Sequence, residues 1–155
     1  MNPIKRVAKE LSDFKSEDNN TIVLEPIDNN LKNILCIIIP DESSIYNLFE
    51  DRKTKLTLIV SISDDYPFSP PKVKFSPTIF HPNVFAVSGD ICLDILKDAW
   101  TPALTISRIC LSILSLLDAP NTSDPINAVA AELYDKDKDD YKNKIKEWYL
   151  EKYNF

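Results

Sequence analysis

The alternation of apolar and polar residues predicts an amphipathic helix at the start of the chain. Apolar side chains recur there at spacings of three and four positions, which places them on one helical face. They are Ile4, Val7, Leu11 and Phe14. Lys5 and Lys9 lie one turn apart on another face. We therefore expect a helix whose apolar stripe packs against the rest of the domain.

A series of short strands follows the polar stretch at residues 16–20. These segments are rich in β-branched residues and are separated by Asp, Asn and Pro, which is typical of strands that end in turns. The predicted strands cover residues 21–27, 31–39, 56–62 and 72–75. Short connections between the first strands favour an antiparallel meander.

Regular periodicity fades between residues 66 and 102, where prolines recur. A loop region this long inside a compact domain usually carries function. Helical signals return after it. Thr105 is a suitable N-cap for a helix that continues to about residue 117. Asp124 followed by Pro125 matches a second helix start, with Asp124 as the cap and Pro125 at the first helical position.

The later helices have predictable packing faces. In the helix after Thr105, the expected core side consists of Ile106, Ile109, Ile113, Leu116 and Leu117. A last helix over about residues 139–152 packs through Tyr141, Ile145, Trp148 and Tyr149. The order of helix, antiparallel sheet, long ordered loop and helices predicts an α+β fold. A length of 155 residues suits one such domain, spanning residues 1–155.

Composition and charge exclude several classes of function. The net charge of -6 disfavours nucleic acid as the main partner, because phosphate binding needs a basic surface. With a single glycine, Gly89, the chain cannot form a glycine-rich phosphate loop, so nucleotide chemistry is not expected. The longest apolar run, residues 34–39, is too short to span a membrane.

The cysteines suggest an intracellular protein that uses a thiol. There are three cysteines, none in a CxxC pair, and one histidine, so we expect neither a disulfide framework nor a metal site. We expect a reduced compartment, the cytoplasm or the nucleus. Cys36 and Cys110 lie among core positions and are predicted to be buried and inert. Cys92 follows a polar turn that leaves it accessible.

The neighbours of Cys92 leave two interpretations open. One interpretation pairs His81 as a base with Cys92 as the nucleophile of a hydrolase, and the other has His81 brace the turn that begins at Pro82. Asn83 either forms a turn or donates a hydrogen bond to an oxyanion. Spacing alone does not decide between these roles.

Five motifs together resemble the ubiquitin-conjugating enzyme family. They are YPFSPP (66–71), HPN (81–83), ICLDIL (91–96), WTPALTI (100–106) and DP (124–125). Both their order and their spacing match, and the similarity covers residues 66–153. The resemblance implies the fold of that family: an N-terminal helix, a four-stranded antiparallel meander, a long active-site loop and C-terminal helices.

The resemblance also implies a transferase mechanism. Cys92 would accept ubiquitin from an activating enzyme as a thioester and pass it to a substrate lysine, usually with a RING- or HECT-type ligase. Asn83 would stabilise the oxyanion, and Asp124 would orient or deprotonate the lysine, unless it is only a helix cap. The residues with implied structural roles in the site are His81, Pro82 and Asp94. No cofactor is implied, because the upstream activating enzyme consumes the ATP.

Two partner surfaces follow from the same resemblance. The residues implied in docking to the activating enzyme and the ligase are Lys5, Arg6, Lys9, Phe68, Pro102 and Ala103. The residues implied in holding donor ubiquitin are Arg108, Leu111, Ser112 and Ser115. We expect a monomer that binds neither nucleic acid nor a membrane.

Three alternatives remain at this stage. The glycine pair that usually precedes the third strand is absent, and residues 50–53 occupy that region, which leaves open a ubiquitin-like modifier instead of ubiquitin. A noncatalytic ubiquitin-binding variant of the same fold is the second alternative, although the presence of Cys92 and Asn83 argues against it. The third is the cysteine hydrolase that uses His81.

Overall fold

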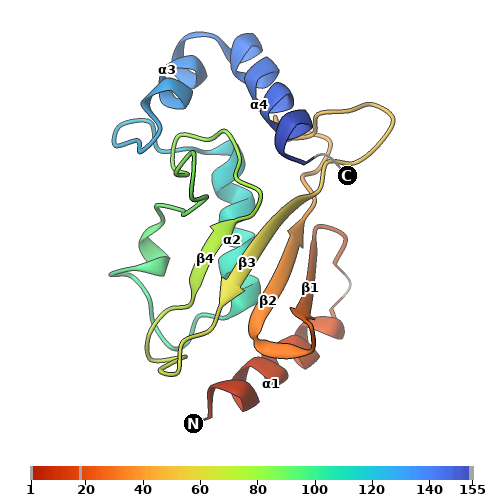
Figure 1. The fold of residues 1–155 in the computed structure, drawn as a ribbon, viewed down its shortest axis with the longest axis vertical. Helices are drawn as coiled ribbons and strands as arrows, with labels where there is room; N and C mark the ends of the chain where they lie inside the picture. The colour runs from red at the N-terminus through yellow and green to blue at the C-terminus, as the bar shows by residue number, and fades with distance from the viewer. Residues whose placement is uncertain (1, 18, 154–155) are drawn as a thin grey trace.

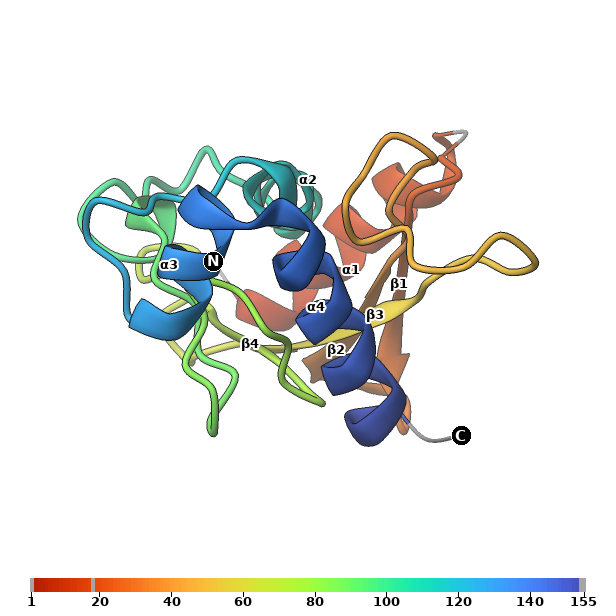
Figure 2. The same ribbon diagram turned by 90° about the horizontal axis from the view of Figure 1, so that it is seen from above.

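A computed structural model describes residues 2–17 and 19–153. Its helices and strands follow one another in the order α1 (Pro3–Lys15), β1 (Ile22–Ile27), β2 (Asn30–Ile38), β3 (Leu56–Ser61), β4 (Lys72–Phe75), the 3₁₀ helix η1 (Asp94–Leu96), α2 (Ile106–Asp118), α3 (Ala128–Lys136) and α4 (Lys138–Lys152). Helix α2 crosses one face of the sheet, with α1 at one end of the molecule and α3 and α4 at the other (Figure 1). Viewed from above, α2 lies to one side of the strands (Figure 2). The predicted α+β architecture is confirmed.

The sheet is an antiparallel meander in the order β1-β2-β3-β4. Pairing aligns Leu24 with Cys36, Cys36 with Leu58, and Leu58 with Phe75, so one row of side chains crosses all four strands. All four side chains are buried. Residues two positions apart point to the same face of a strand, so this register directs one face of the sheet into the core.

The turn between β1 and β2 contains two residues, Asp28 and Asn29. Both have positive φ angles, of 52° and 59°. Hairpins of two residues favour this left-handed geometry, because it matches the twist of the strands, and Asp and Asn tolerate it better than most side chains. The predicted hairpin therefore forms with a tight turn.

Helix α1 is as predicted except at its first apolar position. Val7, Leu11 and Phe14 are buried, whereas Ile4 is 42% exposed. Ile4 lies in the first turn, beyond the surface that the helix packs against. The expectation that Ile4 belongs to the packed stripe is therefore wrong.

Glu10 connects α1 to two distant segments. Its Oε1 accepts a hydrogen bond from the backbone N–H of Ile106, at a distance of 2.7 Å, and its Oε2 accepts from the Arg6 side chain at 3.0 Å. The hydroxyl of Tyr66 also donates to Oε2. The first N–H groups of a helix have no partner within the helix. Glu10 of α1 supplies a hydrogen-bond acceptor for the first N–H group of α2. This bond fixes α1 against α2.

Helix α2 begins where the sequence predicts. Thr105 is its N-cap, and the side chain of Thr105 accepts a hydrogen bond from the N–H of Arg108. Four of the five predicted core residues are buried, while Leu116 is only partly buried. In α4, Tyr141 and Ile145 are buried and Trp148 and Tyr149 are partly buried against the core, as expected.

The predicted helix start at Asp124 is wrong. Helix α3 begins at Ala128, and its N-cap is Asn127, whose side chain accepts from the N–H of Ala130 at 3.1 Å. The backbone N–H groups of Ile126 and Asn127 both donate to the carbonyl of Pro82. These two bonds hold the segment in a non-helical path, so Asp124 lies in an exposed loop three residues before the cap.

Gly89 joins the long loop to the edge of the sheet. Its carbonyl accepts a hydrogen bond from the N–H of Phe75, in β4, at 2.9 Å. Its φ angle is +78°, and a Cβ added there would lie 2.0 Å from the carbonyl oxygen of Phe75. The conformation and the close approach both require a residue without a side chain.

Replacement of Gly89 by Ala is expected to lower the free energy of unfolding by about 2 kcal/mol or more, because the backbone conformation is strained for Ala and the added methyl displaces β4. The matched control is Val87→Ala, at a position 96% exposed in the same turn. This control should change stability by less than about 0.5 kcal/mol. Chemical denaturation measures both. Equal stability of the two variants would contradict the role assigned to Gly89.

Candidate active site

Cys92 lies at the end of a short β-like pairing within the long loop. Val84 and Ile91 form an isolated antiparallel bridge, and the N–H of Cys92 donates to the carbonyl of Asn83 at 2.9 Å. The side chain is partly exposed. The loop after β4 is therefore ordered by backbone hydrogen bonds, and it presents this thiol at the surface.

The other two thiols are buried in the core. Cys36 in β2 and Cys110 in α2 have no exposed surface. Burial raises the pKa of the Cys36 thiol well above its ordinary value, with a smaller contribution from the neighbouring Cys110. A buried thiol that resists ionisation is a poor nucleophile. The prediction that both are buried is confirmed.

His81 is fully buried, and both of its ring nitrogens have partners. The N–H of Asn83 donates to Nδ1 at 3.0 Å, so Nδ1 must be an acceptor. Nε2 therefore carries the proton and donates to the carbonyl of Leu116 at 2.8 Å. Burial lowers the pKa of His81 to about 4. The imidazole braces the loop and has no free nitrogen to serve Cys92 as a base, which removes the basis of the hydrolase interpretation.

The side chain of Asn83 pairs with the backbone of a single residue. Its Nδ2 donates to the carbonyl of Asn121, and its Oδ1 accepts from the N–H of Asn121, both at 2.9 Å. The side-chain amide of Asn83 thus pairs with the Asn121 backbone as a peptide group of a neighbouring strand would. This pairing holds the loop that follows α2 in place. The second Nδ2 proton is not used in this pairing, since an amide nitrogen has two.

Pro82 extends the same set of contacts. Its carbonyl accepts from the N–H groups of Ile126 and Asn127, at 2.9 and 3.0 Å. Residues 81–83 therefore connect the end of α2, the loop at 119–127 and the backbone of Cys92. Asp94 has a related local role: it begins η1, and its backbone carbonyl accepts from Lys97 and Ala99.

An open groove surrounds Cys92. Its lining residues come from the long loop, the end of α2 and the loop before α3: Asn83, Cys92, Leu93, Asp94, Lys97, Asp98, Leu116, Asn121 and Asp124. Three of these carry carboxylates, so the groove attracts cationic groups such as a lysine side chain. Among residues 2–17 and 19–153, no group of three or more acidic, His or Cys side chains is arranged to hold a metal ion.

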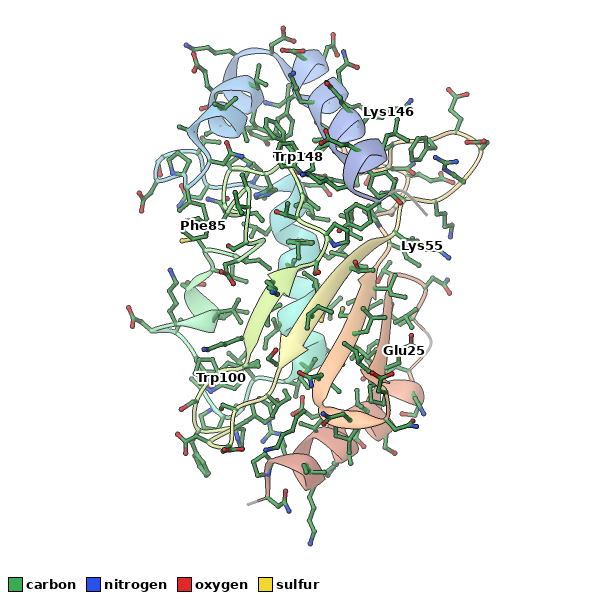
Figure 3. The ribbon with its side chains drawn as sticks, in the orientation of Figure 1. Glu25, Lys55, Phe85, Trp100, Lys146 and Trp148 are labelled. Atoms are coloured by element: carbon green, nitrogen blue, oxygen red, sulfur yellow. The ribbon has the colours of Figure 1, made fainter. Side chains whose placement is uncertain are left out.

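The residues predicted for docking gather at the end of the molecule that holds α1. Phe68 is 65% exposed, and Pro102 and Ala103 are exposed in a neighbouring loop. The indole of Trp100 donates to the carbonyl of Pro67 at 2.9 Å, which joins the two loops near Trp100 in Figure 3.

The basic residues of α1 do not all behave alike. Lys5 and Lys9 are exposed, and Lys9 forms a surface ion pair with Asp13. Arg6 instead donates to the carbonyls of Pro102 and Leu104, at 2.8 and 3.0 Å. Arg6 therefore fixes the loop at 102–104 in place, a structural role that the sequence did not indicate.

The predicted stripe on α2 faces away from the core. Arg108, Leu111 and Ser115 are exposed, and Ser112 is partly exposed. Leu111, which is 41% exposed, places an apolar side chain within this otherwise polar stripe.

Five residues that line the groove were not predicted as site residues: Leu93, Lys97, Asp98, Leu116 and Asn121. Asn121 pairs with Asn83 through its backbone atoms, which no sequence pattern reveals, while its side chain accepts hydrogen bonds from Ser123. Lys97 lies five positions after Cys92, and its Nζ approaches the Cys92 Sγ to 3.7 Å. A lysine soon after a candidate nucleophile was a signal available in the sequence.

The chain matches the family model described as "Ubiquitin-conjugating enzyme" over residues 6–149. The match covers most of the chain, so the protein belongs to the ubiquitin-conjugating enzyme family, and the resemblance is confirmed. In the part of the chain that the structure describes, no helix is long and apolar enough to cross a membrane.

The neutral state of His81 makes stability depend on pH. The pKa of His81 falls from its ordinary 6.5 to about 4 on folding. Between these values the unfolded chain binds a proton that the folded protein excludes, so the free energy of unfolding decreases as pH falls. Between pH 7 and pH 4.5 the wild type should lose about 2 kcal/mol more than His81→Gln, whose amide does not titrate. Urea denaturation at each pH measures this. Parallel pH profiles of the two proteins would contradict the assignment.

Proposed function

We propose that the protein is a ubiquitin-conjugating enzyme that carries ubiquitin as a thioester on Cys92 and transfers it to a substrate lysine. The observation that carries this proposal is the position of Cys92. Of the three thiols it alone is accessible, and it opens onto a groove lined by the carboxylates of Asp94, Asp98 and Asp124. Such a groove suits the approach of a lysine ammonium group.

The first half-reaction needs little from the site. The Cys92 sulfur attacks the C-terminal carbonyl of ubiquitin held as a thioester on the activating enzyme, and the thiolate of that enzyme leaves. One thioester replaces another, so the free-energy change is small. A site without a base or a metal is sufficient for this exchange.

The second half-reaction forms an amide. The lysine amine attacks the thioester carbonyl, an oxyanion forms, and the carbon–sulfur bond breaks to release the Cys92 thiolate. We assign to Asn83 the stabilisation of the oxyanion through its second Nδ2 proton. We assign to Asp124 the orientation of the lysine and the removal of a proton as the amine attacks. Its position in the groove, away from any helix cap, supports this role.

We further propose the partner surfaces. The end of the molecule that holds α1, Phe68 and the loop at 102–103 suits an activating enzyme or a RING- or HECT-type ligase, because an exposed aromatic ring is a typical anchor of an interface. The exposed stripe of α2 suits donor ubiquitin. The enzyme would act as a monomer in the cytoplasm or nucleus, where Cys92 stays reduced. Incubation with each modifier in turn distinguishes ubiquitin from a ubiquitin-like protein.

Cys92 substitutions test the nucleophile directly. With ATP, an activating enzyme and ubiquitin, the wild type should form an adduct that thiol reductants cleave. Cys92→Ala should form none, and Cys92→Ser at most an oxyester that resists reductants. Cys36→Ser and Cys110→Ser are the controls and should retain loading if they fold. Nonreducing gels report the outcome, and wild-type loading of Cys92→Ala would refute the assignment.

Asp124→Asn tests the role of the carboxylate. Because Asp124 is exposed and does not cap α3, the variant should keep its stability within about 0.5 kcal/mol. Thioester loading should persist, but discharge to free lysine should slow at least about tenfold at neutral pH, since general-base assistance is lost. The deficit should shrink as pH rises and free amine accumulates. Single-turnover discharge between pH 6.5 and 9.5 measures it, and unchanged discharge would leave Asp124 without a catalytic role.

A further inference from the structure

The face of the sheet that points away from α2, here called the outer face, has apolar side chains at its centre. In the part of the chain that the structure describes, no helix crosses this face (Figures 1 and 2). Val23 is 41% exposed, and the other apolar residues of the centre are partly exposed: Leu35, Ile37 and Ile59. An apolar patch with charged residues at its rim favours contact with another protein.

One row of side chains crosses the outer face through all four strands. Pairing aligns Glu25 with Leu35, Leu35 with Ile59, and Ile59 with Lys74. Residues paired directly across antiparallel strands point to the same face. The row therefore begins with an acidic residue on β1, continues with two apolar residues and ends with a basic residue on β4. Glu25 and Lys74 are both exposed, and Figure 3 shows Glu25 on the β1 side of the sheet.

The two charges of this row are too far apart to pair within one chain. Neighbouring strands lie about 4.8 Å apart, so Glu25 on β1 and Lys74 on β4 are separated by roughly 14 Å. Within residues 2–17 and 19–153, neither side chain forms an ion pair at 4.0 Å or less. The row thus ends in two unpaired charges of opposite sign.

We propose that two copies of this chain associate through their outer faces, about a two-fold axis parallel to the strands. Such an axis reverses the order of the strands and keeps their direction, so the row faces the same row of the second copy in reverse. Glu25 then lies opposite Lys74 of the second copy, and Leu35 lies opposite Ile59. Because the axis is two-fold, each of these contacts forms twice.

The charges select this axis over the other one that packs the two faces together. A two-fold axis perpendicular to the strands would place each strand opposite itself. Glu25 would then face Glu25, and Lys74 would face Lys74, which like-charge repulsion disfavours. The parallel axis also keeps the strand directions of the two sheets close to each other, as in aligned packing of sheets.

The size of the outer face predicts a weak dimer. Four strands of about six residues cover roughly 20 Å by 20 Å, so two copies would bury about 800 Å² in total. Stable complexes bury about 1,200 Å² or more. We therefore expect half of the chains to associate only at about 100 µM or above, and more dilute protein to be the monomer proposed above.

Association through the outer face leaves the groove around Cys92 open. None of the residues that line this groove belongs to a strand of the sheet. Each copy therefore keeps its own site, and one chain is sufficient for the proposed reaction. The inference does not depend on the proposed function.

Exchange of the two charges tests the proposal in solution. Sedimentation velocity of the full chain, at concentrations from about 10 µM to 1 mM, should show the average mass rising from one chain toward two. Glu25→Lys and Lys74→Glu each place like charges opposite each other, so each variant alone should associate at least about tenfold more weakly. An equal mixture of the two variants restores both contacts between opposite charges. The mixture should therefore associate about as strongly as the wild type.

A control variant separates this contact from the effect of net charge. Glu151→Lys makes the same change of charge at an exposed position of α4, at the end of the molecule (Figure 1). It should associate like the wild type. Thermal melting of each variant shows that the fold is retained, which is expected because Glu25 and Lys74 are exposed.

Each outcome decides for or against the second copy. An average mass of one chain up to about 1 mM overturns the inference. So does association that both single variants retain or that their mixture does not recover. If the mass rises only when ubiquitin is added, the outer face binds ubiquitin and the second copy is the wrong occupant. Association that is lost in each single variant, recovered in their mixture and retained in Glu151→Lys supports the inference, whatever the result of the loading test on Cys92.

Discussion

The candidate active site depends on the hydrogen bonds made by three consecutive residues, His81, Pro82 and Asn83. They satisfy a carbonyl at the end of α2, two N–H groups before α3, and both backbone groups of Asn121. Leaving a buried polar group unpaired costs about 1–3 kcal/mol, so loss of this segment would release several separate parts of the chain at once. The carbonyl of Asn83 also receives the N–H of Cys92. The position of the thiol is therefore set by the same contacts that order the surrounding loops.

Glu10 provides a second fixed point, at the other end of the molecule. Its carboxylate accepts a hydrogen bond from the first N–H of α2. Arg6, on the preceding turn of α1, donates hydrogen bonds to the carbonyls of Pro102 and Leu104. Helix α2 is thus restrained at both ends. Glu10 binds its N-terminus, and His81 donates a hydrogen bond to the carbonyl of Leu116 near its C-terminus. A rigid α2 gives the groove around Cys92 and the proposed docking loops a constant relative position. This arrangement suits the proposed function, in which one site is presented to several partners in turn.

Local patterns were sufficient to predict most of the fold. The strands and the cap at Thr105 depend on spacing and on the chemistry of neighbouring residues, and the structure confirms them. The helix start at Asp124 was wrong because a distant carbonyl, that of Pro82, competes for the N–H groups that the helix would have used. Ile4 was misplaced because the helix extends past its packing partner. Such tertiary effects leave no trace in the local sequence.

The site was only partly accessible to sequence reasoning. The burial of Cys36 and Cys110 followed from their apolar neighbours, and the exposure of Cys92 followed from the polar turn before it. The pairing of Asn83 with the Asn121 backbone has no sequence signature, since any residue type supplies the same backbone atoms. The approach of Lys97 to Cys92 depends on a 3₁₀ turn, whose geometry matches neither the helical nor the strand period.

The hydrogen bonding of His81 has a consequence for how long an acyl group on Cys92 would survive. Water is a weak nucleophile that reacts with thioesters efficiently only when a base removes its proton, and an imidazole is the side chain best suited to that task at neutral pH. The one imidazole in the chain is buried, with both nitrogens bonded to the backbone. Hydrolysis would then be slow, while an amine, which is nucleophilic without such help once neutral, would react on arrival. The lifetime of the acyl group would be set by the supply of amines rather than by the surrounding solvent.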